Sequence, residues 1–414
     1  MKKNRFIFFL LFFVILFNSF GLSAKNTSVV NNSKEFIIAL KMASKGDCII
    51  LKSGVYVGNF FINIPVDIRS DGYVVLTSNN FNRILNVVSD SVNITGLLFY
   101  NSGKNMSSKD SCLFVNGISD NVFAFNNFFL ECGFGIWIDG AAYNYISENV
   151  FIGTSSKILS DRGNSIQLYR NNGSIVNNNF IISGRDGIYI SNSKEVSIYN
   201  NVFLNTRFAV HYMFSHKCNV VSNISVDSLV GAAIMYSKYV DLLNNIYYFN
   251  IGHGLFLRDV LFSRIYRNKS LYNSDGIFLG SSYYNDLINN DVMKNIVGVK
   301  VSNGSSENLV FDNNFLINRL QAHFLDNRSI AWNFIRSGNF WSHYVGWDLN
   351  MDDIGDTRFF VTNISDRLIF TYPVLRIMFN SPALVLLQKI ENQFPAFRGA
   401  SIVDNYPLMS PVLW

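Results

Sequence analysis

Two histidines and a methionine lie close together in the stretch "RFAVHYMFSH", residues 207–216. The chain has only five histidines, so His211, Met213 and His216 concentrate its soft nitrogen and sulfur ligands. Imidazole with thioether favours copper, particularly Cu(I), over zinc or calcium. The stretch therefore predicts a place that holds a soft cation. The structural alternative is the packed wall of a repetitive fold.

The strand that carries His211 determines which side chains can join it. If Val210 and Tyr212 point inward with the other apolar positions, His211 and Met213 point outward on the same strand. Aligning the chain with itself matches His211 to Met235 on the next repeat. We therefore expect His211 and Met235 to be stacked neighbours on the outer face, with His216 at the turn that follows.

Other residues of the same alignment support the structural alternative. Tyr189, Phe256 and Phe278 occupy the same outward column, so the histidine and methionine would simply extend a partly covered aromatic stripe. Cys218 aligns with the inward Val196, and we interpret it as a core residue rather than a ligand.

A second possible chemistry is the cleavage of a polysaccharide. The tripeptide "GHG" around His253, two repeats from His211, is typical of β-helix hydrolases that cut pectic polymers near paired aspartates. The Asp-Asp pair of this chain, Asp352 and Asp353, lies far beyond the repeats. We interpret Asp186 and Asp275, both before Gly-Ile, as turn residues, and we assemble no groove of Lys/Arg with carboxylates. A carbohydrate-binding or carbohydrate-cleaving protein is therefore the weaker alternative.

An acidic stretch near the C-terminus suggests a hard cation. "DLNMDDIGD" places oxygen side chains at Asp348, Asn350, Asp352 and Asp356, which could converge on calcium. The glycine expected at the sharp bend is Asp353 here. An Asx-rich turn without metal is the alternative.

A repeat of about 22 residues organises the chain around these side chains. Asparagine followed by apolar residues recurs at steps of 22 to 24 residues, with one step of 30, at Asn127, Asn149, Asn179, Asn201, Asn223, Asn245, Asn268, Asn290 and Asn314. In phase with it runs a column of short alternating strands such as "GIYIS" and "GIFLG". This pattern predicts an all-β fold, a right-handed parallel β-helix, with the asparagine amides hydrogen-bonded in a ladder.

Departures from the period predict local features of this single elongated domain, residues 25–330. The step of 30 predicts an inserted loop at "SSKILSDR". Residues 36–43 are expected to form a helix that caps the first coil. A disulfide between Cys112 and Cys132 is permitted in an oxidising compartment.

The two ends of the chain differ in composition from the repeats. Lys2, Lys3 and Arg5 precede an apolar run at 6–17, which predicts a signal peptide over residues 1–24 and export. Its removal reduces the formal charge from +5 to +2, and no basic tail remains to bind nucleic acid. Residues 331–414 form a C-terminal segment with an apolar helix after Pro382, expected to pack on the last coil as a cap or on a partner.

Taken together, these motifs resemble one family, the periplasmic NosD proteins. The matching stretches follow in the family's order: "RFAVHYMFSH", "GAAIMYS", "GHGLFL", "SGNFWS", "DLNMDDIGDT", "SPALVLLQKIENQFPA" and "VDNYPLMSP". The resemblance covers nearly all of the exported chain, and its C-terminal part is the most specific.

The resemblance implies a function that spacing does not. It implies a periplasmic accessory protein, not an enzyme, that serves the maturation of the copper centres of nitrous oxide reductase. The implied partners are the membrane subunit of an ABC transporter and its ATPase, the reductase and a copper chaperone. The implied ligand segment falls on His211, Met213, His216 and Met235, with His253 nearby. A third possibility is a scaffold that binds these partners without metal.

Overall fold

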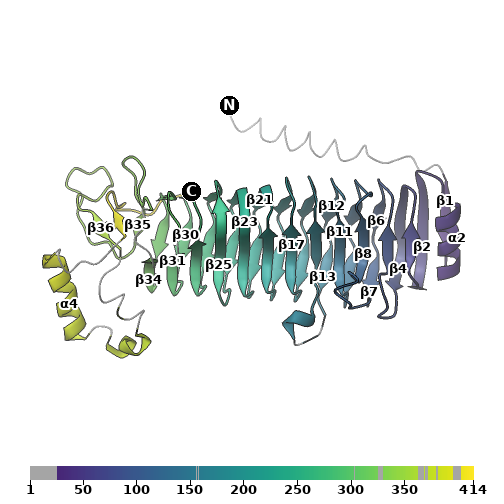
Figure 1. Ribbon diagram of the computed structural model, residues 1–414, viewed down its shortest axis with the longest axis horizontal. Coiled ribbons are helices and arrows are strands. Elements are labelled where there is room, and N and C mark those ends of the chain that lie inside the picture. The colour runs from purple at the N-terminus through teal and green to yellow at the C-terminus, as the bar shows by residue number, and fades with distance from the viewer. Residues whose placement is uncertain are drawn as a thin grey trace.

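The fold is a parallel β-helix in which each coil contributes three strands (Figure 1). The computed structural model describes residues 26–414 except 155, 157, 303, 325–329, 362–367, 369–371, 379–380 and 395–401. Register partners on neighbouring coils are typically 22 residues apart, as with Ile188 and Val210. The predicted β-helix with a coil of about 22 residues is confirmed.

Face 1 consists of strands that pair in parallel from coil to coil. Its members are β3 (Phe60–Ile62), β5 (Leu85–Val87), β8 (Ser111–Asn116), β11 (Phe134–Asp139), β14 (Ile166–Tyr169), β17 (Asp186–Ser191), β20 (Phe208–Met213), the first part of β23 (Val230–Leu243), β25 (His253–Leu261), β28 (Asp275–Gly280), β31 (Val297–Ser302) and β34 (Leu320–Phe324). The candidate ligands His211, Met213, Met235 and His253 all lie on this face.

Face 2 follows face 1 around a corner. Its members are β1 (Thr27–Val30), β2 (Asp47–Val57), β4 (Val66–Thr77), β6 (Asn93–Thr95), β9 (Phe123–Phe125), β12 (Tyr145–Ser147), β15 (Ile175–Asn177), β18 (Ser197–Tyr199), β21 (His216–Val221), the end of β23, β26 (Arg264–Tyr266), β29 (Asp286–Ile288) and β32 (Leu309–Phe311). His216 lies at the start of this face.

Face 3 closes each coil and supplies large core rings such as Phe203 and Tyr247. Its members, after the second halves of β2 and β4, are β7 (Leu98–Tyr100), β10 (Phe128–Leu130), β13 (Val150–Ile152), β16 (Phe180–Ile182), β19 (Val202–Leu204), β22 (Ile224–Val226), β24 (Ile246–Tyr248), β27 (Lys269–Leu271), β30 (Asp291–Met293), β33 (Asn314–Leu316) and β35 (Phe340–Trp341). Apolar side chains from all three faces fill the interior, as the alternating pattern predicts.

The asparagine ladder forms at the corner between faces 2 and 3. Each Nδ2 donates to the Oδ1 of the next asparagine at 2.9–3.1 Å, from Asn127 through Asn290. The next rung is Asn313, not the predicted Asn314, and Asn339 follows it. Asn314 instead hydrogen-bonds Asp291 and the backbone of Val412. The prediction failed at this rung because both neighbouring residues are asparagines.

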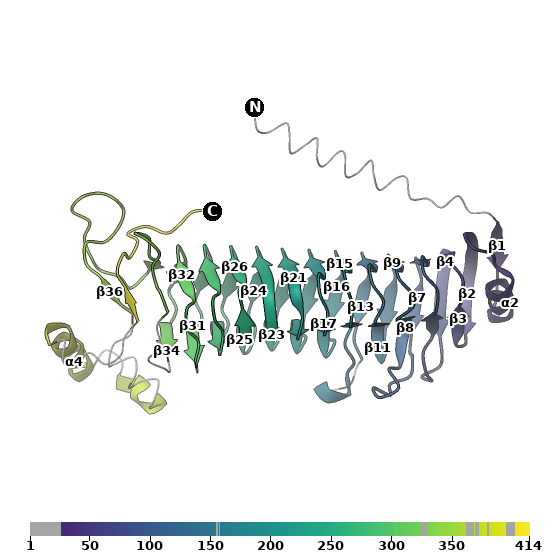
Figure 2. The ribbon, with the colours of Figure 1, turned by 45° about the horizontal axis from the view of Figure 1, so that its top comes forward.

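The N-terminal end of the β-helix is closed as predicted. Helix α2 (Ser33–Met42) begins at Asn32, whose side chain accepts hydrogen bonds from the backbone N–H groups of residues 34 and 35. It buries Phe36 and Ala39 against the first coil. The predicted loop in the step of 30 residues also forms; it carries the short 3-10 helix η1 (Leu159–Asp161) and projects from the coils near β13 (Figure 2).

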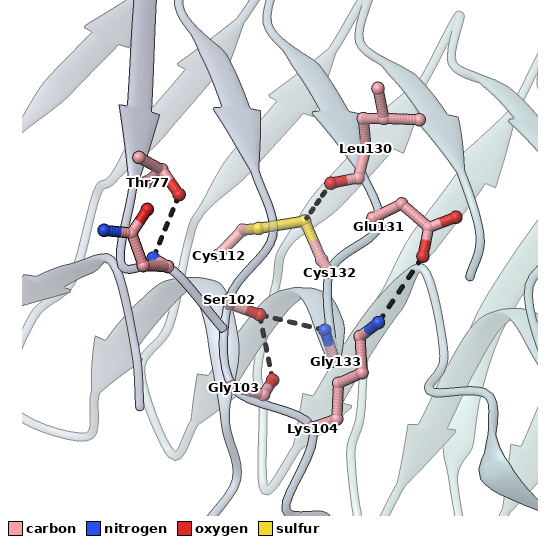
Figure 3. Close-up of a disulfide and its surroundings, with 10 residues drawn as sticks. Thr77, Ser102, Gly103, Lys104, Cys112, Leu130, Glu131, Cys132 and Gly133 are labelled. Atoms are coloured by element: carbon pink, nitrogen blue, oxygen red, sulfur yellow. Dashed lines mark hydrogen bonds and ion pairs between the residues drawn. A yellow bond between two sulfur atoms is a disulfide. The ribbon is translucent and has the colours of Figure 1, made fainter. Parts of the chain in front are cut away.

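Cys112 and Cys132 form the disulfide that the sequence permits (Figure 3). Their Cα atoms are 5.6 Å apart, and the bond joins neighbouring coils. Beside it, Ser102 Oγ accepts a hydrogen bond from the backbone N–H of Gly133. Cys218 is fully buried as a free thiol, in agreement with its interpretation as a core residue.

The C-terminal end is closed by a tryptophan cluster. Trp332 and Trp341 are buried and pack with Phe315 of the last full coil. The buried Asp404 of β37 (Val403–Asp404), which pairs with β36 (Phe359–Phe360), accepts a hydrogen bond from Trp341 Nε1 at 2.8 Å. The expected helix exists as α4 (Pro382–Gln393), but it stands apart from the coils in both views (Figures 1 and 2).

Some sequence predictions fall on residues outside the description. The proposed signal peptide, residues 1–24, lies entirely outside the described residues, and so does part of the C-terminal segment at 362–371 and 395–401. Within the described part of the chain, no helix has the length and apolarity needed to span a membrane.

Candidate metal centre

The outward side chains of face 1 follow from a bulge at the start of each strand. In β17 and β20 the register runs Asp186 to Phe208 and then Ile188 to Val210, which leaves out Gly187. A Cβ on Gly187 would lie 2.5 Å from the ring of Phe203, so this position faces the core and only glycine fits. Asp186 consequently faces outward with the fourth and sixth residues of its strand.

These outward positions line a cleft of about 650 Å³. Its walls combine aromatic rings, cations and one end of the predicted ligand stretch. The lining residues are Lys109, Phe134, Trp137, Asn164, Gln167, Tyr169, Arg185, Asp186, Tyr189, Ser191, Arg207, His211 and Met213.

His211 is held in one orientation by its surroundings. Its Nδ1 lies 2.9 Å from Oδ2 of Asp186, on the preceding coil. The rings of Tyr189 and Phe208 meet the imidazole edge-on, with centroids 4.5 and 4.9 Å away. His211 is only 5% exposed, and its Nε2 is buried without a hydrogen-bond partner. In neutral histidine with a proton on Nδ1, Nε2 carries the lone pair that binds a metal.

Asp186 stays ionised although it is fully buried. Burial acts to raise the pKa of this carboxyl, but the hydrogen bonds and charges of His211 and Arg207 outweigh it, and the pKa is lowered overall. Arg207 donates two hydrogen bonds to the carboxylate, each 2.7 Å long. An ionised Asp186 favours the proton on His211 Nδ1 and leaves Nε2 as the basic atom.

Met213 is the sulfur ligand nearest to His211 in the chain. Both residues face outward on β20, and Tyr189 Oη donates a hydrogen bond to Met213 Sδ at 3.3 Å. Burial raises the pKa of Tyr189, so its phenol remains a donor. A thioether sulfur has a second lone pair, so the hydrogen bond leaves it able to bind a soft metal.

The predicted stacking of His211 on Met235 is wrong. His211 pairs with Ala233, and Met235 pairs with Met213. The error is a shift of two residues, because the sequence match assigned the large Ile234 to the position that the small Ala232 occupies. The core accepts the small residue because the ring of Tyr247 approaches from face 3, where a Cβ on Gly231 would lie 2.4 Å from it. Two methionines, rather than a histidine and a methionine, are therefore adjacent.

His216 does not join this group. It begins β21 on face 2, in register with Lys194 and Lys238, and it is exposed. Its Nδ1 accepts a hydrogen bond from the backbone N–H of Lys238 at 3.1 Å. Partial burial and the positive charge of Lys238 lower its pKa, which keeps the ring neutral.

His253 belongs to a second cluster two coils further along face 1. Its Nδ1 lies 3.0 Å from Oδ2 of Asp275, without hydrogen-bond geometry. Lys300 Nζ lies 3.5 Å from the same oxygen, and the rings of Phe256 and Phe278 flank the imidazole. The structure therefore separates His253 from His211, as the register from Phe208 through Val230 requires.

Asp186 and Asp275 are not turn residues, contrary to the sequence interpretation. They begin strands β17 and β28 and are almost completely buried. The cleft also brings Asp186 together with Lys109, Arg185 and Arg207, a grouping of cations with a carboxylate that the sequence columns did not reveal. The interpretation failed because Asp-Gly is a common turn signal, whereas here the glycine serves the bulge.

The acidic loop uses its oxygens to bind its own backbone. Asp348 accepts hydrogen bonds from the N–H groups of Asp352 and Asp353, and Asp356 accepts one from Leu349. Asp353 has φ of 62°, which explains why glycine is expected there. Within the described ranges, no three His, Cys, Asp or Glu side chains are grouped to hold a metal ion. These contacts favour the Asx-rich turn, and calcium binding by Asp348, Asn350, Asp352 and Asp356 stays a prediction.

Three residues of the candidate centre were missed in the sequence: Asp186 as a carboxylate partner, Arg207 and Tyr189 as a hydrogen-bond donor. A signal for the first was present, since Asp186 lies 22 residues before Phe208, one full coil, and so must neighbour the His211 strand.

Comparison with known proteins identifies the family. The family model described as "Periplasmic copper-binding protein (NosD)" matches residues 152–346. A protein of Pseudomonas aeruginosa named "Probable ABC transporter binding protein NosD" is 34% identical over 373 residues, 87% of each chain. The chain belongs to the NosD family. A NosD protein of Stutzerimonas stutzeri with the same printed name is 32% identical, over 87% of this chain and 86% of that one.

The matched range relates the NosD family to the candidate residues. It contains His211, Met213, His216, Met235 and His253, and it ends before the acidic loop. Proteins of the family are thus described as copper-binding and periplasmic, and relatives are named for an ABC transporter. These descriptions agree with the soft ligands on face 1.

Solved structures resemble this NosD-family chain in fold. An exopolygalacturonase of Yersinia enterocolitica has a TM-score of 0.57 at 10% identity, over 72% of this chain and 77% of that one. The surface adhesin PfbA of Streptococcus pneumoniae has a TM-score of 0.54 at 12% identity, over 72% and 88%. An enzyme and an adhesin share the β-helix, so the fold alone does not determine function.

Proposed function

We propose that this protein binds Cu(I) on face 1 and exchanges it during maturation of the copper centres of nitrous oxide reductase. One observation carries the proposal: the buried Nε2 of His211, unpartnered and oriented by Asp186, lies on the same strand face as Met213. Metal-binding histidines commonly donate their other N–H to a carboxylate in this way. Copper is the cargo here rather than a resident cofactor.

The methionines extend this ligand set. Met213 and Met235 are register partners, so their Cα atoms lie about 4.8 Å apart across neighbouring strands. One imidazole and two thioethers form a soft, neutral ligand set suited to Cu(I). Both methionines are partly exposed, which leaves the metal accessible to the next carrier.

The partners follow from the family. We infer that the protein works in the periplasm with the membrane subunit of an ABC transporter and its ATPase, receives copper from a chaperone and presents it to nitrous oxide reductase. Residues 331–414 would dock on the membrane subunit, because their described part exposes Tyr372, Val374, Ile377 and Leu386. No catalytic step is assigned to the protein.

An anaerobic Cu(I) titration against a competing chelator tests the proposal. The unmodified protein is compared with His211→Ala/Met213→Ala. The matched control is His343→Ala/Met351→Ala, which removes an exposed histidine and methionine from the C-terminal loops. Tight binding that is lost only in the first variant supports the proposal. Unchanged binding in that variant, or no binding by the unmodified protein, contradicts it.

Carbohydrate binding is a second candidate, favoured by the rings of Trp137, Tyr169 and Tyr189 in the cleft. Glycoside hydrolysis is poorly supported, because it needs a proton-donating carboxyl and Asp186 has a lowered pKa and is ion-paired. The other nearby carboxylate, Asp139, pairs with Lys109. Calorimetric titration with oligogalacturonate tests the candidate, and an absence of heat would remove it.

A further inference from the structure

A basic and aromatic surface lies directly beyond the two methionines, where face 1 turns into face 2. We call it the corner surface and define it by Lys194, Phe214, Lys217, Tyr236, Lys238 and Tyr239, all of them exposed. It is continuous with the candidate copper centre, because Phe214 follows Met213 and Tyr236 follows Met235 in the chain.

The positive charge of the corner surface is not neutralised. Lys194, His216 and Lys238 are successive rungs of one column, and strand spacing places them about 4.8 Å apart. Among the residues that the structure describes, Lys194, Lys217 and Lys238 form no ion pair. Elsewhere lysines do pair, as Lys109 does with Asp139.

One acid stands among these lysines. Glu195 is the single carboxylate in the segments 192–196, 214–218 and 236–240, so three lysines face one glutamate. His216 contributes a donor rather than a charge, since its Nδ1 accepts the Lys238 N–H and Nε2 then carries the proton. Like charges stacked along one column repel each other, so the folding of the β-helix alone gives no reason to collect them here.

The aromatic side chains give this surface apolar contact area. The rings of Phe214 and Tyr236 stack at 4.9 Å, and the rings of Tyr239 and Phe262 stack at 5.5 Å. Phe214 is 48% exposed and Tyr239 is 52% exposed. Exposed aromatic residues beside unpaired cations are typical of a surface that docks another protein.

We propose that the corner surface docks an acidic surface of the protein that exchanges copper with this one. This inference rests on the proposed function and adds the partner's chemistry to it. The lysines supply charge complementarity to acids on the partner, and the stacked rings supply the apolar contact. Docking here would bring the partner's copper site next to Met213 and Met235, which border the surface.

The test measures association of the purified full chain with purified apo nitrous oxide reductase by stopped flow. Lys194→Glu/Lys217→Glu/Lys238→Glu is expected to lower the association rate constant at low salt by about tenfold or more, with the difference shrinking as salt increases. The matched control, Lys34→Glu/Lys41→Glu/Lys45→Glu, changes the same charge at the N-terminal end and is expected to have little effect. Phe214→Ala/Tyr236→Ala is expected to raise the dissociation rate.

Three results would overturn the inference. One is an equal loss of association in both triple variants, and another is no association of the unmodified protein with the reductase. The third is binding to phosphatidylglycerol vesicles that depends on the corner lysines while reductase association does not. The Cu(I) titration separates the two proposals, because a protein that binds no copper but still docks through these lysines contradicts the proposed function alone.

Discussion

Asp186 Oδ2 lies 2.9 Å from His211 Nδ1, and both side chains are buried on neighbouring coils of face 1. This pair decides which nitrogen of the histidine is available. Because the carboxylate is held ionised by Arg207, the proton stays on Nδ1 and the lone pair stays on Nε2, toward which no protein group donates. The pair therefore converts an ordinary buried histidine into a potential metal ligand.

Asp186→Asn tests this relationship directly. Loss of the carboxylate is expected to weaken Cu(I) binding by about 10- to 100-fold, because the imidazole loses its orientation and basicity. Nitrogen NMR of the His211 ring should report a mixture of tautomers in the variant. Asp241→Asn is the matched control, since it breaks a carboxylate that also makes two bonds to an arginine, Arg264, outside the cleft. Equal affinity in the two variants would contradict the role of Asp186.

The lowered pKa of Asp186 predicts a pH dependence of stability. Burial raises this pKa, but His211 and Arg207 lower it by more, so the folded-state pKa lies below the unfolded value of about 3.9. The carboxylate consequently stabilises the fold above the unfolded pKa, and this contribution is lost as pH falls through the folded one. Denaturant unfolding should show Asp186→Asn to be less stable by about 3 kcal/mol near neutral pH. A gap that stays constant into strong acid would contradict the assignment.

The two methionines should act as sulfur ligands in the copper-loaded protein. X-ray absorption at the copper edge is expected to lose sulfur scattering in Met213→Leu and in Met235→Leu, because leucine fills a similar volume without a donor atom. The substitution itself should cost less than about 1.5 kcal/mol of stability. Met293→Leu on face 3 is the control and should leave the spectrum unchanged. Identical spectra in all three variants would remove the methionines from the site.

Removal of one ladder asparagine should destabilise the β-helix without affecting copper. Asn223 Nδ2 donates to Asn245 Oδ1 and to two backbone carbonyls, so Asn223→Ala leaves several buried groups unpaired. The expected loss is about 2–4 kcal/mol in denaturant unfolding. Asn219→Ala, at an exposed position of the same coil, should change stability by less than about 0.5 kcal/mol. Equal losses would show that the ladder adds no stability.

The disulfide should contribute to stability but not to copper binding. Cys112→Ser/Cys132→Ser opens a covalent loop with a sequence separation of 20 residues and should cost about 3 kcal/mol. The candidate centre on β20 should keep its Cu(I) affinity, because contacts in a β-helix run mainly between neighbouring coils. Unfolding midpoints and the chelator titration on the same samples measure both quantities. A parallel fall in copper affinity would indicate that the early coils also shape the centre.

The sequence by itself determined the fold and the ladder. The period of about 22 residues follows from identical positions returning once per coil, and stacked asparagines must recur at that period to meet. Asn127 through Asn290, the N-terminal cap over Phe36 and the pairing of Cys112 with Cys132 could all be read from spacing and residue type. Family membership followed from the motifs of the middle coils and C-terminus and is confirmed by the relatives.

Only the tertiary structure decided which side chains meet. A shift of two residues moved His211 from Met235 to Ala233, because the core filled the space over small residues with Tyr247 from another face. The carboxylate that orients His211 was interpreted as a turn residue, because the bulge at Gly187 that turns Asp186 outward depends on Phe203. Periodicity fixes the coil on which a residue lies, but packing across the interior fixes its register within that coil.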